Sequence, residues 1–275
     1  MRDTTIAFIG TGNMAGALIR GLLQDGHPAD RIIAADPDMD KLAAICGESG
    51  INSSSDNNAA VAGADVIVLA VKPQIMADVA QGIAASVQQH RPLVVSIAAG
   101  IPVRHLEHWL GHGIAIVRTM PNTPAMLQTG ATGLFAGEHV SEEQRNLAES
   151  IMRAVGITVW VDREGLIDAV TAVSGSGPAY FFLFMEEMIR AAGALGLDEQ
   201  DASLLTLQTA LGAARMALES NDPPATLRAR VTSPGGTTER AIRVFEEEGL
   251  EQLVKRAMTA ARDRSIELSS QLPED

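Results

Sequence analysis

The first half of the chain alternates short, continuous apolar runs with stretches of helical periodicity. Five runs have the length and composition of buried strands: residues 5–9, 32–35, 66–71, 93–97 and 114–118. A helical pattern over about residues 13–25 follows the first run. Apolar strands separated by helices are typical of a parallel sheet that is covered on both faces. Ligands of such sheets bind beyond the carboxyl ends of the strands, so the loops after these runs form the expected binding edge.

The second half has a different pattern, because strand-like runs disappear after about Gly165 and Ala, Leu and Met recur at helical spacing. Five helices are predicted there: residues 178–195, 198–219, 223–231, 237–248 and 250–272. Several of these helices are rich in Ala and Leu and must bury apolar faces, which favours an interface between two copies of the chain. We therefore expect an α/β domain over residues 1–163, followed by an all-α dimerisation domain over residues 164–275.

A glycine-rich turn separates the first predicted strand from the first predicted helix. Its sequence, Gly10-Thr11-Gly12-Asn13-Met14-Ala15, matches the G-x-G-x-x-A pattern of dinucleotide-binding turns. In that pattern Gly10 permits the tight turn, Gly12 lets the backbone approach a pyrophosphate, and Ala15 keeps helix and strand close. A turn that only packs tightly has the same glycines, but the strand–turn–helix context favours binding. The first domain is therefore predicted to be a Rossmann domain for NADPH or NADH.

Asp36 ends the second predicted strand, about 21 positions after Ala15, where an acid that binds the adenosine ribose is expected. A carboxylate there favours NADH, because it repels the 2′-phosphate of NADPH. Lys41 offsets this charge only if its side chain reaches back. The alternative is that Asp36 caps a helix before Pro37, and the sequence leaves both roles open.

Three further polar residues lie after predicted strands or at the start of predicted helices. Asn57 precedes a short helix and is expected to be an N-cap, an adenosine-ribose contact, or both. Lys72 follows the third strand and is placed near the cofactor, with an ordinary surface lysine as the alternative. Asn122 lies in a loop stiffened by Pro121 and Pro124, where it faces the nicotinamide or the substrate unless the loop is simply a rigid turn.

Two loops of small residues directly precede helices in the second domain. Residues 174–180 (SGSGPAY) permit close approach of the backbone either to a ligand or to another helix. If the loop binds a ligand, Ser176 is a candidate substrate contact. Residues 233–238 (SPGGTT) gather hydroxyls and free amides at the positive end of a helix. These features predict an anion site of carboxylate size. The alternative, a simple helix cap, needs one Ser or Thr but does not explain the paired glycines Gly235 and Gly236.

Composition and charge exclude several classes of function. The 34 acidic and 21 basic residues leave a net charge of −13, which disfavours nucleic-acid binding, and aromatic residues are only 3% of the chain. Cys46 is the single cysteine, so neither an internal disulfide nor a Cys-rich metal site is expected. We see no signal-peptide pattern and no apolar run as long as a membrane span, which predicts a cytoplasmic protein without a membrane partner.

The histidines limit the possible chemistry, because none of the six lies in the predicted helical domain. A dehydrogenase that uses a histidine base from that domain is therefore disfavoured. His105, His108 and His112 share a possible helix face, but they lack acid or thiolate partners. We expect a solvated face rather than a metal site.

Imine reduction suits the residues that remain. A ketone needs a strong proton donor for its developing alkoxide, whereas an imine nitrogen can be protonated before hydride arrives. Ser233 and Thr238 are then sufficient to hold and orient the imine, with a substrate carboxylate on the amides of Gly235, Gly236 and Thr237. Positioning supplies most of the rate in such a site.

These motifs resemble the pyrroline-5-carboxylate reductase family. The matching segments run in order along nearly the whole chain: residues 8–15 (FIGTGNMA), 70–74 (AVKPQ), 96–101 (SIAAGI), 120–124 (MPNTP), 172–180 (AVSGSGPAY) and 231–238 (VTSPGGTT). The first segment is common to dinucleotide-binding proteins, and the last two are specific to this family.

The resemblance implies hydride transfer from NADPH or NADH to the imine carbon of 1-pyrroline-5-carboxylate, giving L-proline in the last step of proline biosynthesis. It implies that the helical domain interlocks with a second subunit, and that the dimers assemble further, commonly to decamers. In the family, the segment 233–238 binds the substrate and the hydroxyl of Thr238 lies near the imine nitrogen. The family's cofactor-side positions are Gly12, Asn13, Met14, Asn57, Val71, Lys72, Pro73 and Ala98 here. Members often prefer NADPH, and Asp36 departs from that pattern.

Two alternatives remain. A related imine or β-hydroxyacid dehydrogenase has a similar architecture, but the catalytic lysine of the β-hydroxyacid enzymes falls at Phe181 in this chain. A non-catalytic dinucleotide sensor has the same first domain, and it leaves the hydroxyls and glycines of residues 233–238 unexplained. Consumption of NADPH in the presence of pyrroline-5-carboxylate separates the enzyme from the sensor.

Overall fold

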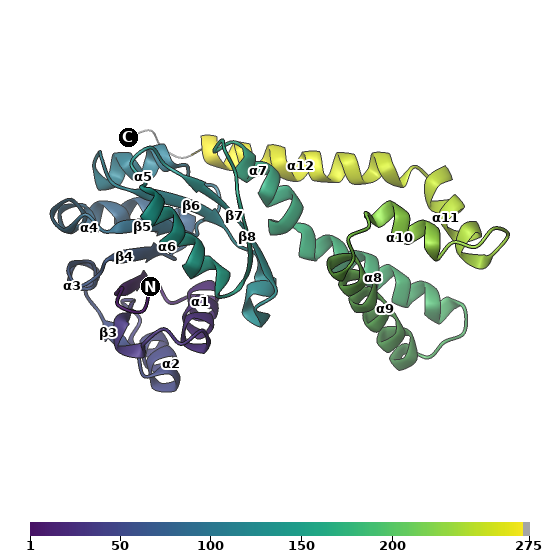
Figure 1. The fold of residues 1–275 in the computed structure, drawn as a ribbon, viewed down its shortest axis with the longest axis horizontal. Helices are drawn as coiled ribbons and strands as arrows, with labels where there is room; N and C mark the ends of the chain where they lie inside the picture. The colour runs from purple at the N-terminus through teal and green to yellow at the C-terminus, as the bar shows by residue number, and fades with distance from the viewer. Residues whose placement is uncertain (272–275) are drawn as a thin grey trace. The chain divides into compact units, whose positions relative to one another are not determined.

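The computed structural model describes residues 1–271 and contains one eight-stranded sheet (Figure 1). The strands are β1 (Ile6–Ile9), β2 (Ile32–Ala35), β3 (Asn52–Ser54), β4 (Val66–Leu69), β5 (Leu93–Ser96), β6 (Ile116–Met120), β7 (Gly130–Ala136) and β8 (Gly156–Trp160). Their order is β3-β2-β1-β4-β5-β6-β7-β8, and all neighbours are parallel except β6 and β7. The order of the first six strands is that of dinucleotide-binding Rossmann sheets.

Seven helices and several short turns connect or follow the strands. The helices are α1 (Asn13–Gln24), α2 (Met39–Ser49), α3 (Asn57–Ala62), α4 (Met76–His90), α5 (Val103–Leu110), α6 (Glu142–Arg153) and α7 (Leu166–Val170). The short elements are the 3-10 turns η1 (Ala29–Arg31), η2 (Pro73–Ile75) and η3 (Thr123–Leu127), and the π-helical turn η4 (Thr171–Gly175). The rest of the described chain is helical, in α8 (Gly177–Ala194), α9 (Glu199–Glu219), α10 (Pro224–Arg230), α11 (Thr237–Glu247) and α12 (Leu250–Ser270).

Each of the five strands and six helices predicted from the sequence is present. The prediction missed β3, β7 and β8, whose residues are polar, glycine-rich or partly exposed. The five predicted strands pair in parallel, as expected, and the antiparallel neighbour of β6 is the unpredicted strand β7. The end of the last predicted helix, residue 272, lies outside the described residues.

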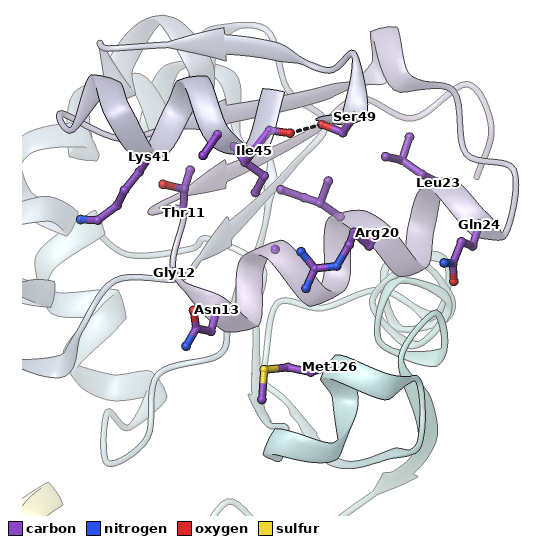
Figure 2. Close-up of a pocket in the computed structure, with 13 residues that line it drawn as sticks. Thr11, Gly12, Asn13, Arg20, Leu23, Gln24, Lys41, Ile45, Ser49 and Met126 are labelled. Atoms are coloured by element: carbon purple, nitrogen blue, oxygen red, sulfur yellow. Dashed lines mark hydrogen bonds between the residues drawn. The ribbon is translucent and has the colours of Figure 1, made fainter. Parts of the chain in front are cut away.

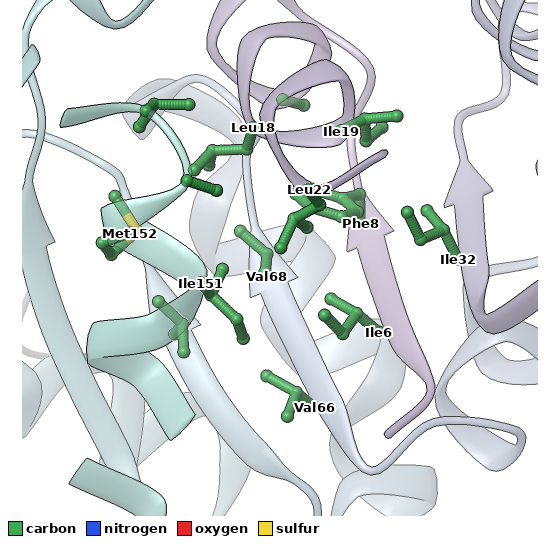
Figure 3. Packing of buried hydrophobic residues seen from close by; sticks show 14 of the residues in the cluster. Ile6, Phe8, Leu18, Ile19, Leu22, Ile32, Val66, Val68, Ile151 and Met152 are labelled. Atoms are coloured by element: carbon green, nitrogen blue, oxygen red, sulfur yellow. The ribbon is translucent and has the colours of Figure 1, made fainter. Parts of the chain in front are cut away.

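Helices cover both faces of the sheet. On one face, Ile6 and Phe8 of β1 lie in one apolar cluster with Leu18 and Leu22 of α1 and Ile151 of α6 (Figure 3). On the other face, the alternate residues of the same strands cluster with α3, α4 and α5. Successive side chains of a strand point to opposite faces, so continuous apolar runs are required here. Burial of each such side chain contributes about 1.5–3 kcal/mol.

The chain forms two compact units, which we call unit 1 and unit 2. Unit 1 comprises Met1–Ser176 and the described residues from Ala261 to 271, and unit 2 comprises Gly177–Ala260. The segment after the predicted boundary at 163/164 still belongs with the sheet, because Val170 of α7 lies against Gly133 of β7. The hydroxyl of Ser265, near the end of α12, donates a buried 2.7 Å hydrogen bond to Asp168 of α7. This contact explains why the chain's last helix returns to unit 1.

One helical run, Leu166–Ala194, is long and apolar enough to cross a membrane by length and composition alone. The expectation that no run reaches that length is therefore wrong for this helix. Only 17% of its most apolar window is buried within the chain. An apolar seam between two copies of the chain produces the same signal, so this run does not define a membrane span.

Candidate active site

The carboxyl edge of the parallel strands brings the predicted cofactor residues of unit 1 into one region. Because β1, β2, β4 and β5 are parallel, the loops that follow them leave the sheet at the same edge. Backbone bonds tie these loops together, from the amide of Gly10 to the carbonyl of Ala35 (2.7 Å) and from Ala70 to Ile9 (2.8 Å). The residues carried there are Gly10, Gly12, Asn13, Met14, Asp36, Val71, Lys72, Pro73 and Ala98.

The glycine-rich turn has the geometry that its sequence requires. Gly10 has a φ of +97°, and a Cβ atom there would lie 2.8 Å from the carbonyl oxygen of Ala70, so a side chain is excluded. Gly12 is the N-cap of α1, with no side-chain hydrogen bond to the helix and no atom within 4 Å of the place of a Cβ. An open helix N-terminus beside a glycine fits a dinucleotide pyrophosphate.

Asp36 anchors this turn to the end of β2. One of its carboxylate oxygens accepts from both the amide and the hydroxyl of Thr11, each at 2.9 Å. The other accepts from the amide of Asp38 at 3.0 Å. Asp36 therefore fixes the glycine-rich loop, a role that the sequence reading did not include. The competing idea that Asp36 caps the next helix is wrong, because Asp38 is the residue that does so.

Asp38 and Lys41 form the start of α2. The carboxylate of Asp38 accepts from the amides of Asp40 (3.1 Å) and Lys41 (3.2 Å) and pairs with the Lys41 ammonium at 3.1 Å. The hydrogen bond from Lys41 holds the pKa of Asp38 below its usual value, and the same contact raises the pKa of Lys41. The pattern of an acid just before a helix signals such a cap, and this signal at Asp38 was missed.

A cavity of about 470 Å³ opens beside the glycine-rich turn, between α1 and α2 (Figure 2). Thr11, Gly12 and Asn13 line it at the turn, with Arg20 from α1 and Lys41 from α2. Sequence reasoning did not place Arg20 in this site, because nothing in the pattern distinguishes it from other exposed arginines.

Asn57 is the first residue of α3, and Lys72 lies in the loop after β4. The N-cap of α3 is Asp56, whose carboxylate accepts from the amide of Asn58 at 2.8 Å, so the expectation that Asn57 is the cap is wrong. The adenosine-ribose contact of Asn57 stays a prediction. Lys72 is exposed and directly precedes the 3-10 turn η2.

Asn122 connects the loop after β6 to the π-helical turn η4. Its side-chain amide donates to the carbonyl of Ser174 and accepts from the amide of Ala131 in β7, both at 2.9 Å. Only 9% of Asn122 is exposed. Within η4 the amide of Ser176 donates to the carbonyl of Thr171, a wider ring than in an α-helix, and such turns occur often at functional sites. Asn122 thus holds two of the predicted loops together.

In unit 2, the predicted substrate loop leads into α11. Gly235 has a φ of +72°, and Gly236 is the N-cap of α11 without any side-chain capping bond. The simple alternative of a Ser or Thr cap is therefore wrong. The carboxylate of Glu239 accepts from the amide of Gly235 at 2.9 Å, an internal anion on one of the proposed substrate amides. Ser233 is exposed and Thr238 is half-buried on the first turn of the helix.

Two other expectations concern Ser176 and the histidines. Ser176 belongs to unit 1, whereas Ser233, Gly235, Gly236, Thr237 and Thr238 belong to unit 2. Over residues 1–271, no group of three or more His, Cys, Asp or Glu side chains is arranged to hold a metal ion. The expectation of a solvated histidine face is wrong for His105, which is buried with its ring 5.7 Å from that of Trp109.

A Rossmann sheet with an open glycine-rich turn, joined to a helical unit, defines the class of dinucleotide-dependent oxidoreductases. Family comparisons agree: residues 5–100 match "NADP oxidoreductase coenzyme F420-dependent", and residues 164–268 match "Pyrroline-5-carboxylate reductase dimerisation". The chain is 55% identical to the pyrroline-5-carboxylate reductase of Pseudomonas aeruginosa, over 99% of both chains. It belongs to the pyrroline-5-carboxylate reductase family, whose members are oxidoreductases that use NAD(P)H.

Solved structures of this family have the same fold. A pyrroline-5-carboxylate reductase from Coxiella burnetii is 48% identical, with a TM-score of 0.94 over 97% of this chain and 98% of that one. The Plasmodium falciparum enzyme, solved with NADP bound, is 29% identical with a TM-score of 0.85 over 98% and 99%. The match of residues 164–268 to the dimerisation family also supports a homo-oligomer with a small-molecule substrate.

Proposed function

We propose that this chain reduces the imine of 1-pyrroline-5-carboxylate to L-proline, with the two units dividing the work. Unit 1 binds the dinucleotide, and unit 2 provides most of the substrate contacts. The observation that carries the proposal is the start of α11, where Gly236 is an N-cap without a side-chain hydrogen bond and Ser233 and Thr238 flank it in the sequence. In a chain with a net charge of −13, such a loop is a place for a small anion.

On the cofactor side, the open N-terminus of α1 at Gly12, Asn13 and Met14 is suited to hold the pyrophosphate. We expect Asp36 and Asn57 to contact the adenosine ribose. We expect the loops with Val71, Lys72, Pro73 and Ala98 to line the path toward the nicotinamide. Bound NAD(P)H supplies the hydride. Asn122 acts by positioning, because both ends of its amide are used to join two loops.

On the substrate side, the amides of Gly235, Gly236 and Thr237 bind the carboxylate of pyrroline-5-carboxylate. The hydroxyl of Thr238 holds the imine nitrogen, with Ser233 beside it, and Ser176 is a further substrate contact. An imine nitrogen is readily protonated, so these hydroxyls need only orient it and no strong acid is required. Glu239 leaves the amide of Gly235 when the substrate carboxylate takes its place.

The assembly and location are part of the same proposal. The exposed apolar faces of α8 and α9 support a dimer, and dimers of this kind can assemble further into a decamer. The free thiol of Cys46 suits a reducing compartment such as the cytoplasm. A partner role for nucleic acid or membrane is not proposed, because the chain is strongly acidic.

Initial rates of NADH and NADPH oxidation with pyrroline-5-carboxylate test the proposal, with proline identified as the product. Gly235→Ala should lower kcat/KM strongly, because it distorts the substrate loop. Gly249→Ala is a matched control: its φ of +75° equals that of Gly235 (+72°) within a few degrees, and both have open space at the Cβ position. The backbone strain is thus the same, about 1 kcal/mol. Absence of turnover in the unmodified enzyme would overturn the proposal in favour of a dinucleotide sensor.

A further inference from the structure

We propose that this enzyme selects NADH over NADPH, and that Asp38 together with Asp36 makes the selection. The inference rests on the proposed function, since it concerns the same dinucleotide site. Neither the family nor the NADP-bound relative assigns a preference to this chain. Three features at the end of β2 support it, and each involves one of these two carboxylates.

The first feature is the start of α2, which lies directly after β2. Free amides at a helix N-terminus bind phosphate well, and an adenosine 2′-phosphate projects toward the end of the second strand of a Rossmann sheet. Here the amides of Asp40 and Lys41 both donate to one oxygen of Asp38. The chain's own carboxylate therefore occupies the donors that a 2′-phosphate would use.

The second feature is the ion pair between Asp38 and Lys41. The ammonium of Lys41 lies 3.1 Å from the second oxygen of Asp38. Each side chain is partly exposed, 58% for Lys41 and 43% for Asp38, so the pair is accessible to a ligand. Because Lys41 is already neutralised, a phosphate gains little from it unless Asp38 moves.

The third feature is the fixed orientation of Asp36. Three donors, the amide and hydroxyl of Thr11 and the amide of Asp38, hold its carboxylate in place. An ionised carboxylate only accepts hydrogen bonds, so it can receive the hydroxyls of a free ribose and repels a phosphate. Asp36 thus favours the ribose of NADH, while Asp38 removes the donors and the charge that NADPH needs.

Besides Lys41, the cation Arg20 lines the cavity beside this region and competes for a 2′-phosphate. It comes from α1 rather than α2 (Figure 2). If Arg20 bound the 2′-phosphate, the Asp38 cap would not decide the preference. An Arg20→Ala variant therefore belongs in the test.

Binding of NADH and NADPH to the full chain is measured by calorimetry without substrate, for the unmodified protein and five variants: Arg20→Ala, Asp38→Gly, Asp36→Ser, the double variant of the last two, and Asp40→Asn. Asp38→Gly frees the amides and Lys41 at little cost, since glycine is an acceptable N-cap. Asp36→Ser removes the repelling charge and keeps a hydroxyl beside Thr11. Asp40→Asn is the matched control, because it removes the same charge from the first turn of α2 and keeps the backbone amide that donates to Asp38.

The unmodified enzyme should bind NADH at least about tenfold more tightly than NADPH. Asp38→Gly and Asp36→Ser should each reduce that ratio by several fold, and the double variant should reverse it, whereas Asp40→Asn should not change it. Equal or tighter binding of NADPH to the unmodified enzyme would overturn the preference. So would a loss of NADPH binding in Arg20→Ala alone, with the Asp38 and Asp36 variants unchanged. Either result would leave the proposed function intact. Failure of either dinucleotide to bind would overturn both.

Discussion

Unit 1 and unit 2 bury their apolar residues to very different extents. In unit 1, every residue of β1 and β4 is fully buried between layers of helices. In unit 2, the long helices α8 and α9 have only Gly177, Ala202 and Thr206 buried. Large apolar residues such as Phe181 (68%) and Leu204 (67%) are mostly exposed in the single chain.

This difference indicates what each unit needs in order to be stable. Unit 1 contains a core of its own, whereas unit 2 exposes more apolar surface than a stable monomer tolerates. A second copy of the chain is the partner that the dimerisation match supports. Perturbing unit 2 should therefore affect the assembly and the activity, whereas perturbing unit 1 should have local effects on stability.

The largest effect is expected from a charge in the apolar face of α9. Leu211→Arg should raise the dissociation constant of the dimer by at least about 100-fold, since an unpaired charge in an interface costs about 3 kcal/mol. Sedimentation at micromolar concentration measures this change. Leu127→Arg in unit 1 is the control, because Leu127 is also exposed (81%, against 54% for Leu211) and should leave the dimer intact. A dimer that stays intact in Leu211→Arg would contradict the conclusion that the apolar face of α9 lies in the dimer interface.

A smaller effect is expected at the substrate loop. Thr238→Ala should lower kcat/KM for pyrroline-5-carboxylate by about tenfold to hundredfold, the range for loss of a hydrogen bond to a charged group. Cofactor affinity should not change, because Thr238 belongs to unit 2. Thr238→Ser keeps the hydroxyl and should recover most of the activity. An unchanged kcat/KM in the alanine variant would exclude Thr238 from the site.

In unit 1, the amide of Asn122 provides a test of local stability. Asn122→Asp still accepts from Ala131 but cannot donate to the carbonyl of Ser174, and it places a charge beside that carbonyl. The free energy of unfolding should fall by about 1–3 kcal/mol, measured by urea denaturation. Asn146→Asp, an exposed change on α6, should have no comparable effect. If the two variants are equally stable, Asn122 does not hold these loops together.

The smallest effect is expected at the edge strand β8. Trp160 donates from its indole to Glu149 at 2.8 Å, and this bond holds the pKa of Glu149 below its usual 4.5. The stabilisation is therefore fully present above pH 4.5 and is lost as the pH falls through the lowered pKa. Trp160→Phe removes the indole N–H but retains an aromatic ring beside Arg145, and it should cost about 1 kcal/mol at neutral pH. The difference from the unmodified protein should shrink in acid, and a constant difference would contradict this account.

A sequence predicts best those strands and helices in which buried apolar residues recur at a regular spacing along the chain. The five apolar runs are buried on both faces, and the helices of unit 2 have clear starts and stops, such as Asp198 before α9. Strand β7 escaped prediction because Gly130 and Gly133 have no side chains to form a pattern. At the site, the glycine-rich turn was recognisable from spacing alone. The caps at Asp38 and Asp56 and the bridge through Asn122 depend on side-chain direction, which spacing does not encode.

The hydrogen bond between Ser265 and Asp168 has a practical consequence for anyone who wishes to divide this protein. A fragment that stops at Ser176 keeps the whole sheet but loses the residue that satisfies a buried carboxylate on α7. The sheet-bearing half is therefore not a contiguous stretch of chain, and synthesis must reach its last turns before that half is complete. A shortened protein meant for cofactor studies should carry Asp168→Asn or retain a tethered copy of the final helix.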